Sequence, residues 1–267
     1  MKFRLYSILV ALIAFTASCE KVIDIDVKDT DKKYVIEGVV TDQPDGHFVK
    51  ITRSKNLSEN NNFAGITDAT VTVSDEDGNT TVFEEEGEGI YKPANFNGVI
   101  GKRYTLTVDI EGEKFTAVST MPQKVLMDTL FITEEFLFGQ IRKSANITYT
   151  DPAGEGNRYR FVQFIEGVKY EEVFIATDEY SDGNEITEKL RTPSDDDEYQ
   201  IASGDTVTIH ALCIDRPVFD FWYTYLTSGA TGGSGTASPA NPTTNIQGGA
   251  LGYFSAHTVQ VLEAVAP

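Results

Sequence analysis

A short acidic segment is the first place where residue types and spacing suggest chemistry. Asp75-Glu76-Asp77-Gly78-Asn79 has the carboxylate and amide spacing with which an EF-hand calcium loop begins. That loop also needs glycine at its sixth position and glutamate at its twelfth. Here these positions hold Thr80 and Glu86, so the glycine that makes the sharp turn is missing. We therefore interpret Asp77-Gly78 as a two-residue hairpin turn and not as a metal site.

Catalytic motifs are equally weak. His47, His210 and His257 are isolated, with no H-x-x-x-H or C-x-x-C spacing for zinc. Gly233-Ser234-Gly235 lies in a Gly/Ser/Thr-rich stretch and lacks the strand-to-helix context of a nucleophile elbow. A carboxylate pair for glycoside hydrolysis is defined by the distance between the two groups in the folded chain, which the sequence does not reveal. We expect no catalysis, no cofactor and no metal.

Cys19 carries the clearest chemical signal. Lys2 and Arg4 precede an apolar run, Ile8 to Phe15, and the small residues Thr16-Ala17-Ser18 follow it. This order is typical of a secretory signal peptide. Cleavage after residue 18 would leave a cysteine thiol at the new N-terminus, where bacterial lipoproteins carry their acyl chains. We therefore expect residues 1–18 to be removed and Cys19 to anchor the chain to a membrane.

Two other interpretations of this N-terminus remain open. The lipoprotein pattern usually has leucine three residues before the cysteine, where this chain has Thr16, so an ordinary signal peptide is the alternative. A spanning helix fits less well, because the apolar stretch from Leu5 to Ala17 has about 13 residues against the roughly 20 required. An acylated Cys19 also leaves Cys213 without a disulfide partner, and its apolar surroundings predict a core position.

The charge of the chain excludes one class of partner. The formal net charge is −19, with 41 acidic residues against 22 lysines and arginines. Such a surface repels phosphate backbones, so we expect no binding to nucleic acid. It also disfavours adsorption to anionic lipid, which leaves membrane attachment to the acyl chains.

Period-2 apolar alternation between turn signals predicts an all-β fold. We expect residues 19–33 to form a lipidated polar leash and residues 34–122 to form an N-terminal β-sandwich of the immunoglobulin-like or transthyretin-like kind. A second β domain occupies residues 125–267. Its expected strands are 129–136, 145–150, 159–165, 170–177, 206–214 and 253–263.

Two segments of the second domain differ from this pattern. Residues 178–198 hold nine acids against two bases, which predicts an exposed, mobile excursion, and whether it binds a cation stays open. Asp215-Arg216-Pro217 predicts the start of a helix near residues 217–227. Helical spacing would then place Phe219, Trp222, Tyr223 and Leu226 on one buried face.

The segment from Asn241 to Ala256 is the candidate ligand or partner loop. Its glycines suggest positive φ, and its large side chains offer contact surface. A buried connection between the helix and the last strand is the alternative. The candidate residues are Asn245, Gly248, Gly249, Leu251, Tyr253 and Phe254.

Family resemblance supports the architecture. Residues 65–73, Asp77-Gly78 and 89–91 resemble transthyretin-like and carboxypeptidase-regulatory modules. Residues 19–26, 34–54 and 241–256 together resemble Bacteroidota lipoproteins of the domain-of-unknown-function 4249 family. This resemblance implies a partner, because such proteins are often encoded beside TonB-dependent outer-membrane receptors. It implies no enzyme activity and no site residues.

These observations lead to a lipid-anchored binding or accessory protein of the outer membrane, working with a TonB-dependent receptor. The membrane face, periplasmic or surface, is undecided. One alternative is a surface module that binds carbohydrate or peptide through exposed aromatic rings on a concave face. A hydrolase with a pocket of convergent polar residues is the other.

Overall fold

The computed structural model describes residues 31–56, 59–60, 62–137, 139–154, 156–191, 200–228 and 240–267. Cys19, the expected signal peptide and Gly233-Ser234-Gly235 lie outside these residues. Two compact units are distinguished, Met1–Asp31 with Asn56–Asn60, and Lys32–Lys55 with Asn61–Pro267. In the first unit, the Glu59 amide donates to the Asn56 carbonyl. All that follows concerns the second unit, and no helix among the described residues is long and apolar enough to cross a membrane.

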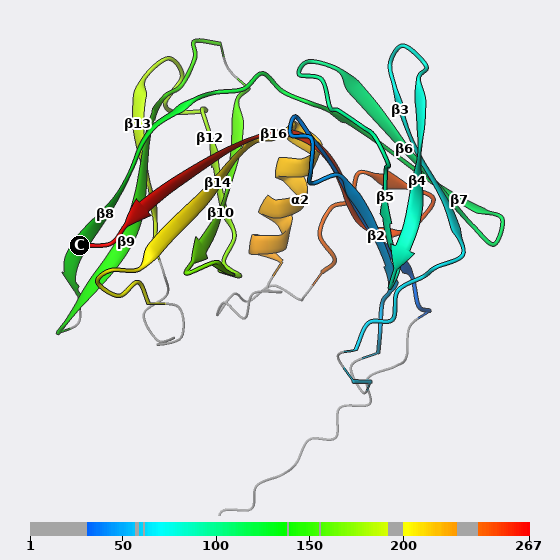
Figure 1. Ribbon diagram of the computed structural model, residues 1–267, viewed down its shortest axis with the longest axis horizontal. Coiled ribbons are helices and arrows are strands. Elements are labelled where there is room, and N and C mark those ends of the chain that lie inside the picture. The colour runs from blue at the N-terminus through cyan, green and yellow to red at the C-terminus, as the bar shows by residue number, and fades with distance from the viewer. Residues whose placement is uncertain are drawn as a thin grey trace, which may run out of the picture. The chain divides into compact units, whose positions relative to one another are not determined.

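Seven strands form the first half of this unit (Figure 1). The alternating burial of β1 and β6 shows why they form, because every second side chain is apolar and enters a core. Asp77-Gly78 makes the turn between β3 and β4, as predicted, and Gly78 has a φ of 89°. The strands are β1 (Tyr34–Thr41), β2 (Phe48–Arg53), β3 (Ala69–Asp75), β4 (Thr80–Gly87), β5 (Ile90–Lys92), β6 (Arg103–Ile110) and β7 (Glu113–Thr120).

The described residues of the second half add further strands and one helix, α2 (Arg216–Thr227). The helix begins where predicted, because the Asp215 side chain accepts from the Val218 amide and Pro217 stands in the first turn. The strands are β8 (Met127–Leu137), β9 (Gln140–Thr150), β10 (Arg158–Ile165), β11 (Val168–Lys169), β12 (Phe174–Thr177), β13 (Glu185–Leu190), β14 (Thr206–Cys213), β15 (Ile246–Gln247) and β16 (Leu251–Val265).

The long last strand, β16, joins the two halves. Its beginning pairs in parallel with β1, from Val35 opposite Leu251 to Thr41 opposite His257. Its end pairs antiparallel with β14, beginning with Thr258 opposite Cys213. The large sheet therefore runs β11-β10-β14-β16-β1-β2-β5-β4-β3-β6-β7-β15, and β13-β9-β8 form a second sheet.

The described residues form three hydrophobic clusters, and the smallest packs α2 against Leu212 and Tyr253. The largest is built from β1 to β7 together with Phe254 and Ala256 of β16. The second lies among β8, β9, β10 and β14 and includes Cys213, which is buried as predicted. The prediction of an all-β chain with sandwich-type packing and one short helix is confirmed. The proposed boundary between residues 122 and 125 stays a prediction.

Two local predictions are wrong. Part of the acidic segment is strand β13, which pairs with β9 and buries Leu190, because Ile186 and Leu190 have a core to reach. Glu185 is exposed, whereas Glu188 is half-buried and burial raises its pKa. The buried face of α2 is also different from the predicted one. It is formed by Val218 and Phe221, whereas Tyr223 is 54% exposed.

Candidate functional site

A cleft lies over one face of the large sheet, beneath α2. Each strand that forms its floor sends alternate residues into a core and the intervening residues into the cleft. On β1 the cleft side chains include Glu37 and Val39, and on β16 they include Tyr253, Ser255 and His257. Strands β10 and β14 contribute Arg160, Val162, His210 and Leu212.

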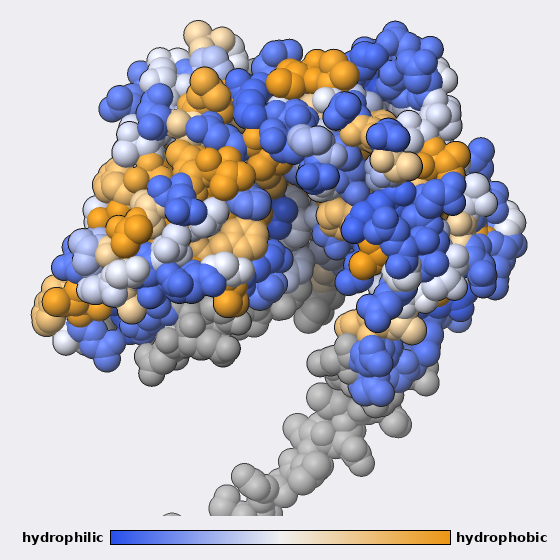
Figure 2. Space-filling model, viewed as in Figure 1, coloured by the Kyte–Doolittle hydropathy of each residue, from blue (hydrophilic) through white to orange (hydrophobic). Residues whose placement is uncertain are grey.

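The cleft consists of two adjoining hollows of about 250 and 480 Å³. Both are lined by Glu37, Arg160, Val162, Lys169, Trp222 and Tyr253. Figure 2 shows the surface hollowed between the part that carries β8 and β9 and the part that carries β3 and β4. Volumes of this size suit a small organic ligand or a short stretch of a larger one.

Arg160 is the central charge of the cleft. Its guanidinium carbon lies 3.7 Å from the centroid of the Trp222 ring, which is a close cation–π contact. Burial lowers the pKa of Arg160, while Tyr253 and Glu37 act in the opposite direction. Its Nε is buried without a hydrogen-bond partner, and within the described residues no carboxylate forms an ion pair with it. Trp222 Nε1 is likewise buried and unpartnered.

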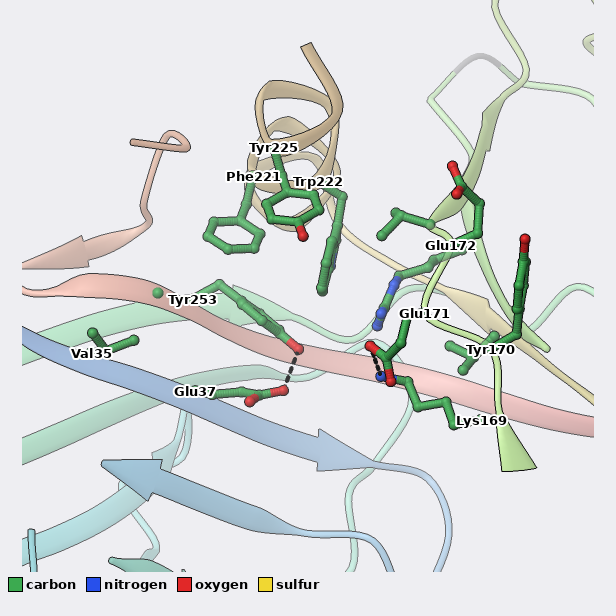
Figure 3. Close-up of a pocket in the computed structure, with 14 residues that line it drawn as sticks. Val35, Glu37, Lys169, Tyr170, Glu171, Glu172, Phe221, Trp222, Tyr225 and Tyr253 are labelled. Carbon is green, nitrogen blue, oxygen red and sulfur yellow. Dashed lines mark hydrogen bonds and ion pairs between the residues drawn. The ribbon is translucent and has the colours of Figure 1, made fainter. Parts of the chain in front are cut away.

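Tyr253 and Glu37 connect the two parallel strands below the helix. The Tyr253 hydroxyl donates to a Glu37 carboxylate oxygen at 2.9 Å (Figure 3). Burial, followed by the Glu37 charge, raises the pKa of Tyr253, so the phenol stays protonated. Glu37 thus accepts a hydrogen bond from Tyr253. It lines the same cleft as Arg160 and Trp222, whose buried nitrogen donors have no acceptor.

Aromatic rings and charged side chains form the walls. Figure 3 shows Phe221, Trp222 and Tyr225 extending from α2 toward Tyr253, with Glu171 and Lys169 near the other end. Trp222 and Tyr225 are half-buried, so each ring keeps an accessible part. Lys169 lies 3.6 Å from Glu171 across an exposed ion pair. The cleft thus combines ring surface, hydrogen-bond donors and one poorly neutralised cation.

A serine–histidine pair lies in the floor of the larger hollow. Ser255 Oγ is 2.8 Å from His257 Nδ1, the distance of a nucleophile and its general base. Burial, followed by the charge of Arg160, lowers the pKa of His257 to about 3. An imidazole with this pKa is a weak base near neutral pH. Ser255 is also only 1% exposed, so the pair is better suited to packing than to attack on a substrate.

In the predicted ligand or partner loop, Asn245 and Phe254 make contacts within the fold, and a binding role for the loop stays a prediction. Asn245 bonds both the amide and the carbonyl of Phe254, at 2.9 and 2.7 Å, and Phe254 is fully buried. Gly248 and Gly249 have the expected positive φ, 101° and 93°, in the turn after β15, and Leu251 is half-buried. Among the named candidates, Tyr253 is the one that lines the cleft.

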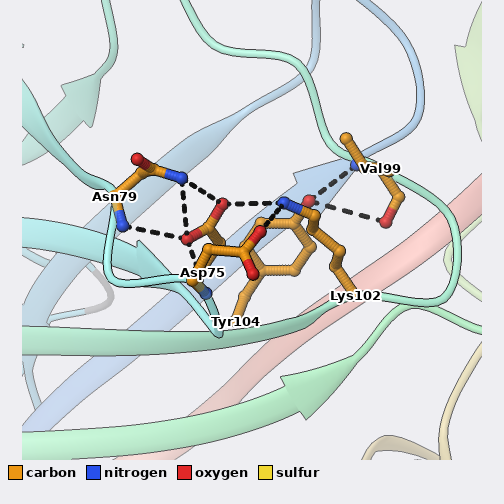
Figure 4. Close-up of polar contacts among 6 residues, drawn as sticks. Asp75, Asn79, Val99, Lys102 and Tyr104 are labelled. Carbon is orange, nitrogen blue, oxygen red and sulfur yellow. Dashed lines mark hydrogen bonds and ion pairs between the residues drawn. The ribbon is translucent and has the colours of Figure 1, made fainter.

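The calcium-loop-like segment contains an internal cation. Lys102 Nζ lies 3.0 Å from Asp75 and 2.6 Å from Asp77, and Asn79 also bonds Asp75 (Figure 4). Hydrogen bonds from Asn79 and Lys102 lower the pKa of Asp75 to about 2. A lysine therefore neutralises these carboxylates, in agreement with the hairpin interpretation.

Sequence reasoning missed the main residues of the cleft. Arg160 and Glu37 alternate with apolar residues in their strands, which is also the pattern of a solvent-facing side chain. Trp222 was expected in the core. The only available signal was an arginine in an otherwise apolar and aromatic strand, Tyr159-Arg160-Phe161-Val162.

These features define an all-β, sandwich-type protein with a single described helix that covers one end of a sheet-floored cleft. The sequence places it in a family. A family model described as "Domain of unknown function (DUF4249)" matches residues 20–263, so the chain belongs to this family. A search of curated proteins found no match.

Proposed function

We propose that this protein is a lipid-anchored binding protein of the outer membrane, and that its ligand occupies the cleft between α2 and the sheet. The observation that carries the binding role is that Arg160 and Trp222 both line this cleft and that each has a buried nitrogen donor, Nε and Nε1, without an acceptor. A buried donor without an acceptor costs about 1–3 kcal/mol. An acceptor on a ligand would remove that cost.

The chemistry of the cleft favours a ligand that bears a carboxylate. A guanidinium binds a carboxylate through two parallel hydrogen bonds, and within the described residues Arg160 has no such partner. The half-buried rings of Trp222 and Tyr225 offer a surface for an apolar or sugar-ring portion next to that group. Both a peptide with a free carboxylate and an acidic sugar meet these requirements.

Calorimetric titration of the full chain tests this proposal. Short peptides and acidic oligosaccharides would be compared with their amidated or neutral counterparts. We expect binding to depend on the carboxylate and to weaken at least about tenfold in Arg160→Met, because a charge-assisted hydrogen bond contributes about 1.5–3 kcal/mol. Arg103→Met, on β6 away from the cleft, is the matched control. Equal binding of acid and neutral forms would contradict the proposal.

Membrane anchoring and receptor partnership form the second part of the proposal. They are supported by the order of residues around Cys19 and by the acidic composition, which leaves attachment to acyl chains. Affinity purification of the full chain from detergent-solubilised membranes should recover a TonB-dependent outer-membrane receptor. Recovery of the chain alone in several detergents would count against the receptor.

Hydrolysis is the alternative that has a specific observation, the contact between Ser255 and His257. We expect no turnover, because the lowered pKa makes His257 a weak base. Incubation with activated ester substrates would test this. Turnover that disappears in Ser255→Ala, with ligand binding unchanged, would favour a hydrolase.

A further inference from the structure

A group of three carboxylates lies away from the cleft, where two loops meet. Asp151 begins the loop between β9 and β10, and Asp178 and Asp182 belong to the loop between β12 and β13. One carboxylate oxygen from each residue lies within 4.8 Å of the others. Asp151 and Asp178 are 1% and 2% exposed, whereas Asp182 is exposed.

Each carboxylate holds its loop with one oxygen. Asp178 Oδ2 accepts from the amides of Gly156 and Asn157, both at 2.7 Å. Asp182 Oδ1 accepts from the Gly154 amide at 2.6 Å. Asp151 Oδ1 accepts from the Tyr159 hydroxyl. The described residues provide no hydrogen bond to the second oxygen of any of the three.

The buried second oxygen of Asp151 is the independent sign of a missing ligand. Asp151 Oδ2 is fully enclosed and has no hydrogen-bond partner. Within the described part of the chain, no lysine or arginine forms an ion pair with the group. The nearby Arg158 bonds the Gly156 carbonyl and stacks over Phe219 instead. Buried carboxylates without a counter-charge are strongly unfavourable.

We propose that Asp151, Asp178 and Asp182 bind one calcium ion that joins the two loops. Calcium binds oxygen at about 2.3–2.6 Å, so a single ion spans two oxygens up to about 5 Å apart. The spacing of these carboxylates fits within that limit. Calcium also accepts irregular geometry and fills its remaining positions with water, which suits a group that is open on the Asp182 side.

The contrast with Asp75 and Asp77 strengthens this assignment. In that hairpin Lys102 lies between the carboxylates and neutralises them. The loops at Asp151 and Asp178 have no equivalent basic side chain among the described residues. A divalent ion would supply the same neutralisation, and it would connect β9 and β10 to β12 and β13 through their loops.

Terbium luminescence provides a direct test on the full chain. Tyr159 contacts Asp151, so its ring is close enough to sensitise a terbium ion bound to the group. We expect one saturable terbium site per chain, displaced by calcium with a dissociation constant on the order of 10⁻⁴ M and by magnesium more weakly. Calcium should also raise the thermal unfolding midpoint relative to EDTA.

Two variants separate this site from general surface acidity. Asp182→Asn keeps an oxygen for the Gly154 amide but removes the charge, and we expect at least about tenfold weaker calcium binding. Glu179→Gln removes an equal charge from the same loop and should have no effect. The proposal is overturned if the full chain shows no saturable binding, or if both variants bind calcium as the natural chain does.

Discussion

The guanidinium of Arg160 lies 3.7 Å above the indole ring of Trp222, so a strand of the large sheet and the helix above it meet through a cation and an aromatic face. Phe221 and Tyr253 also contact this indole, with ring centroids 5.1 and 5.2 Å away. The cation–π contact between Arg160 and Trp222 therefore fixes the helix against the sheet where the two elements line the cleft.

Replacement of Trp222 should destabilise the fold. In Trp222→Leu, Arg160 loses its aromatic face while remaining half-buried, and we expect the free energy of unfolding to fall by about 2 kcal/mol. Chemical denaturation measures this change. Tyr223→Leu, at the exposed neighbouring position, should cost less than about 0.5 kcal/mol. Equal costs for the two variants would show that the cation–π contact contributes nothing.

At Gly252, β16 closely approaches the backbone of β1. A Cβ there would lie 2.0 Å from the Ile36 carbonyl oxygen, and its φ is +99°. Gly252→Ala should therefore separate the parallel pair and cost more than about 3 kcal/mol. Gly249→Ala has a similar φ, +93°, with nothing within 4 Å, and should cost only about 1–2 kcal/mol. Similar unfolding midpoints for the two variants would contradict this account.

The sequence predicted most strands because their cores impose period-2 alternation, and it predicted α2 because Asp215 and Pro217 mark its start. Strand β13 was missed because three of the six residues in its sequence, Glu-Ile-Thr-Glu-Lys-Leu, are charged. Its apolar residues, Ile186 and Leu190, are recognised as core residues only in the folded structure. The cleft was missed for a topological reason. Tyr253 and Glu37 are 216 positions apart in sequence, and only the parallel pairing of β1 with β16 brings them together.

Histidine burial should make stability depend on pH. Burial and Arg160 lower the pKa of His257 from 6.5 to about 3, so below pH 6.5 the unfolded chain binds a proton that the folded chain does not. Stability should therefore decrease as the pH falls from 6.5 toward 3, by up to about 1.4 kcal/mol per unit. Burial also lowers the pKa of His47 and His210, which adds to this trend.

Thermal unfolding across that pH range measures the effect. His257→Gln should reduce the slope, and the remaining slope should come from the other two histidines and from acidic groups. An unchanged slope in His257→Gln would show that His257 is not the main titrating group.

Asp215 joins the helix to the N-terminal strands. Its Oδ1 accepts from the Val218 amide at 3.2 Å, and its Oδ2 accepts from Ser119 Oγ and the Thr120 amide, both at 2.9 Å. Asp215→Ala removes the cap and leaves two donors unpaired, so we expect a loss of about 2–4 kcal/mol in chemical denaturation. Asp220→Ala, which removes an exposed pair with Arg216, should cost less than about 0.5 kcal/mol.

Burial raises the pKa of Asp215, which opposes part of its stabilising effect. The folded pKa of this carboxyl lies above its unfolded value of 3.8. The titration of Asp215 therefore lowers the free energy of unfolding as the pH rises through that range. Asp215→Asn avoids this cost but provides one acceptor oxygen in place of two. We therefore expect it to lose less stability than Asp215→Ala at neutral pH, and the reverse order would contradict the capping role.

The anchor at Cys19 can be tested against the second cysteine of the chain. The thiol of Cys19 is the expected acylation site, whereas Cys213 is 4% exposed and accepts a hydrogen bond from the Val125 amide. We expect the natural chain to incorporate labelled palmitate and to partition into detergent. Cys19→Ala should lose both properties, and Cys213→Ala should keep them. Two or three acyl chains at about 0.8 kcal/mol per buried CH₂ give stable attachment, whereas one gives only marginal binding.

A chain that begins at Glu20 extends this test, because it removes the anchor and keeps every described residue. We expect it to be soluble, monomeric and rich in β-structure by circular dichroism, since Cys19 precedes the first described strand at Tyr34. It should also keep the ligand binding proposed for the cleft. A natural chain found in the soluble fraction without label would overturn the anchor, and the proposed location and receptor would then lose their support. Binding in the cleft would remain a separate question, decided by Arg160 and Trp222.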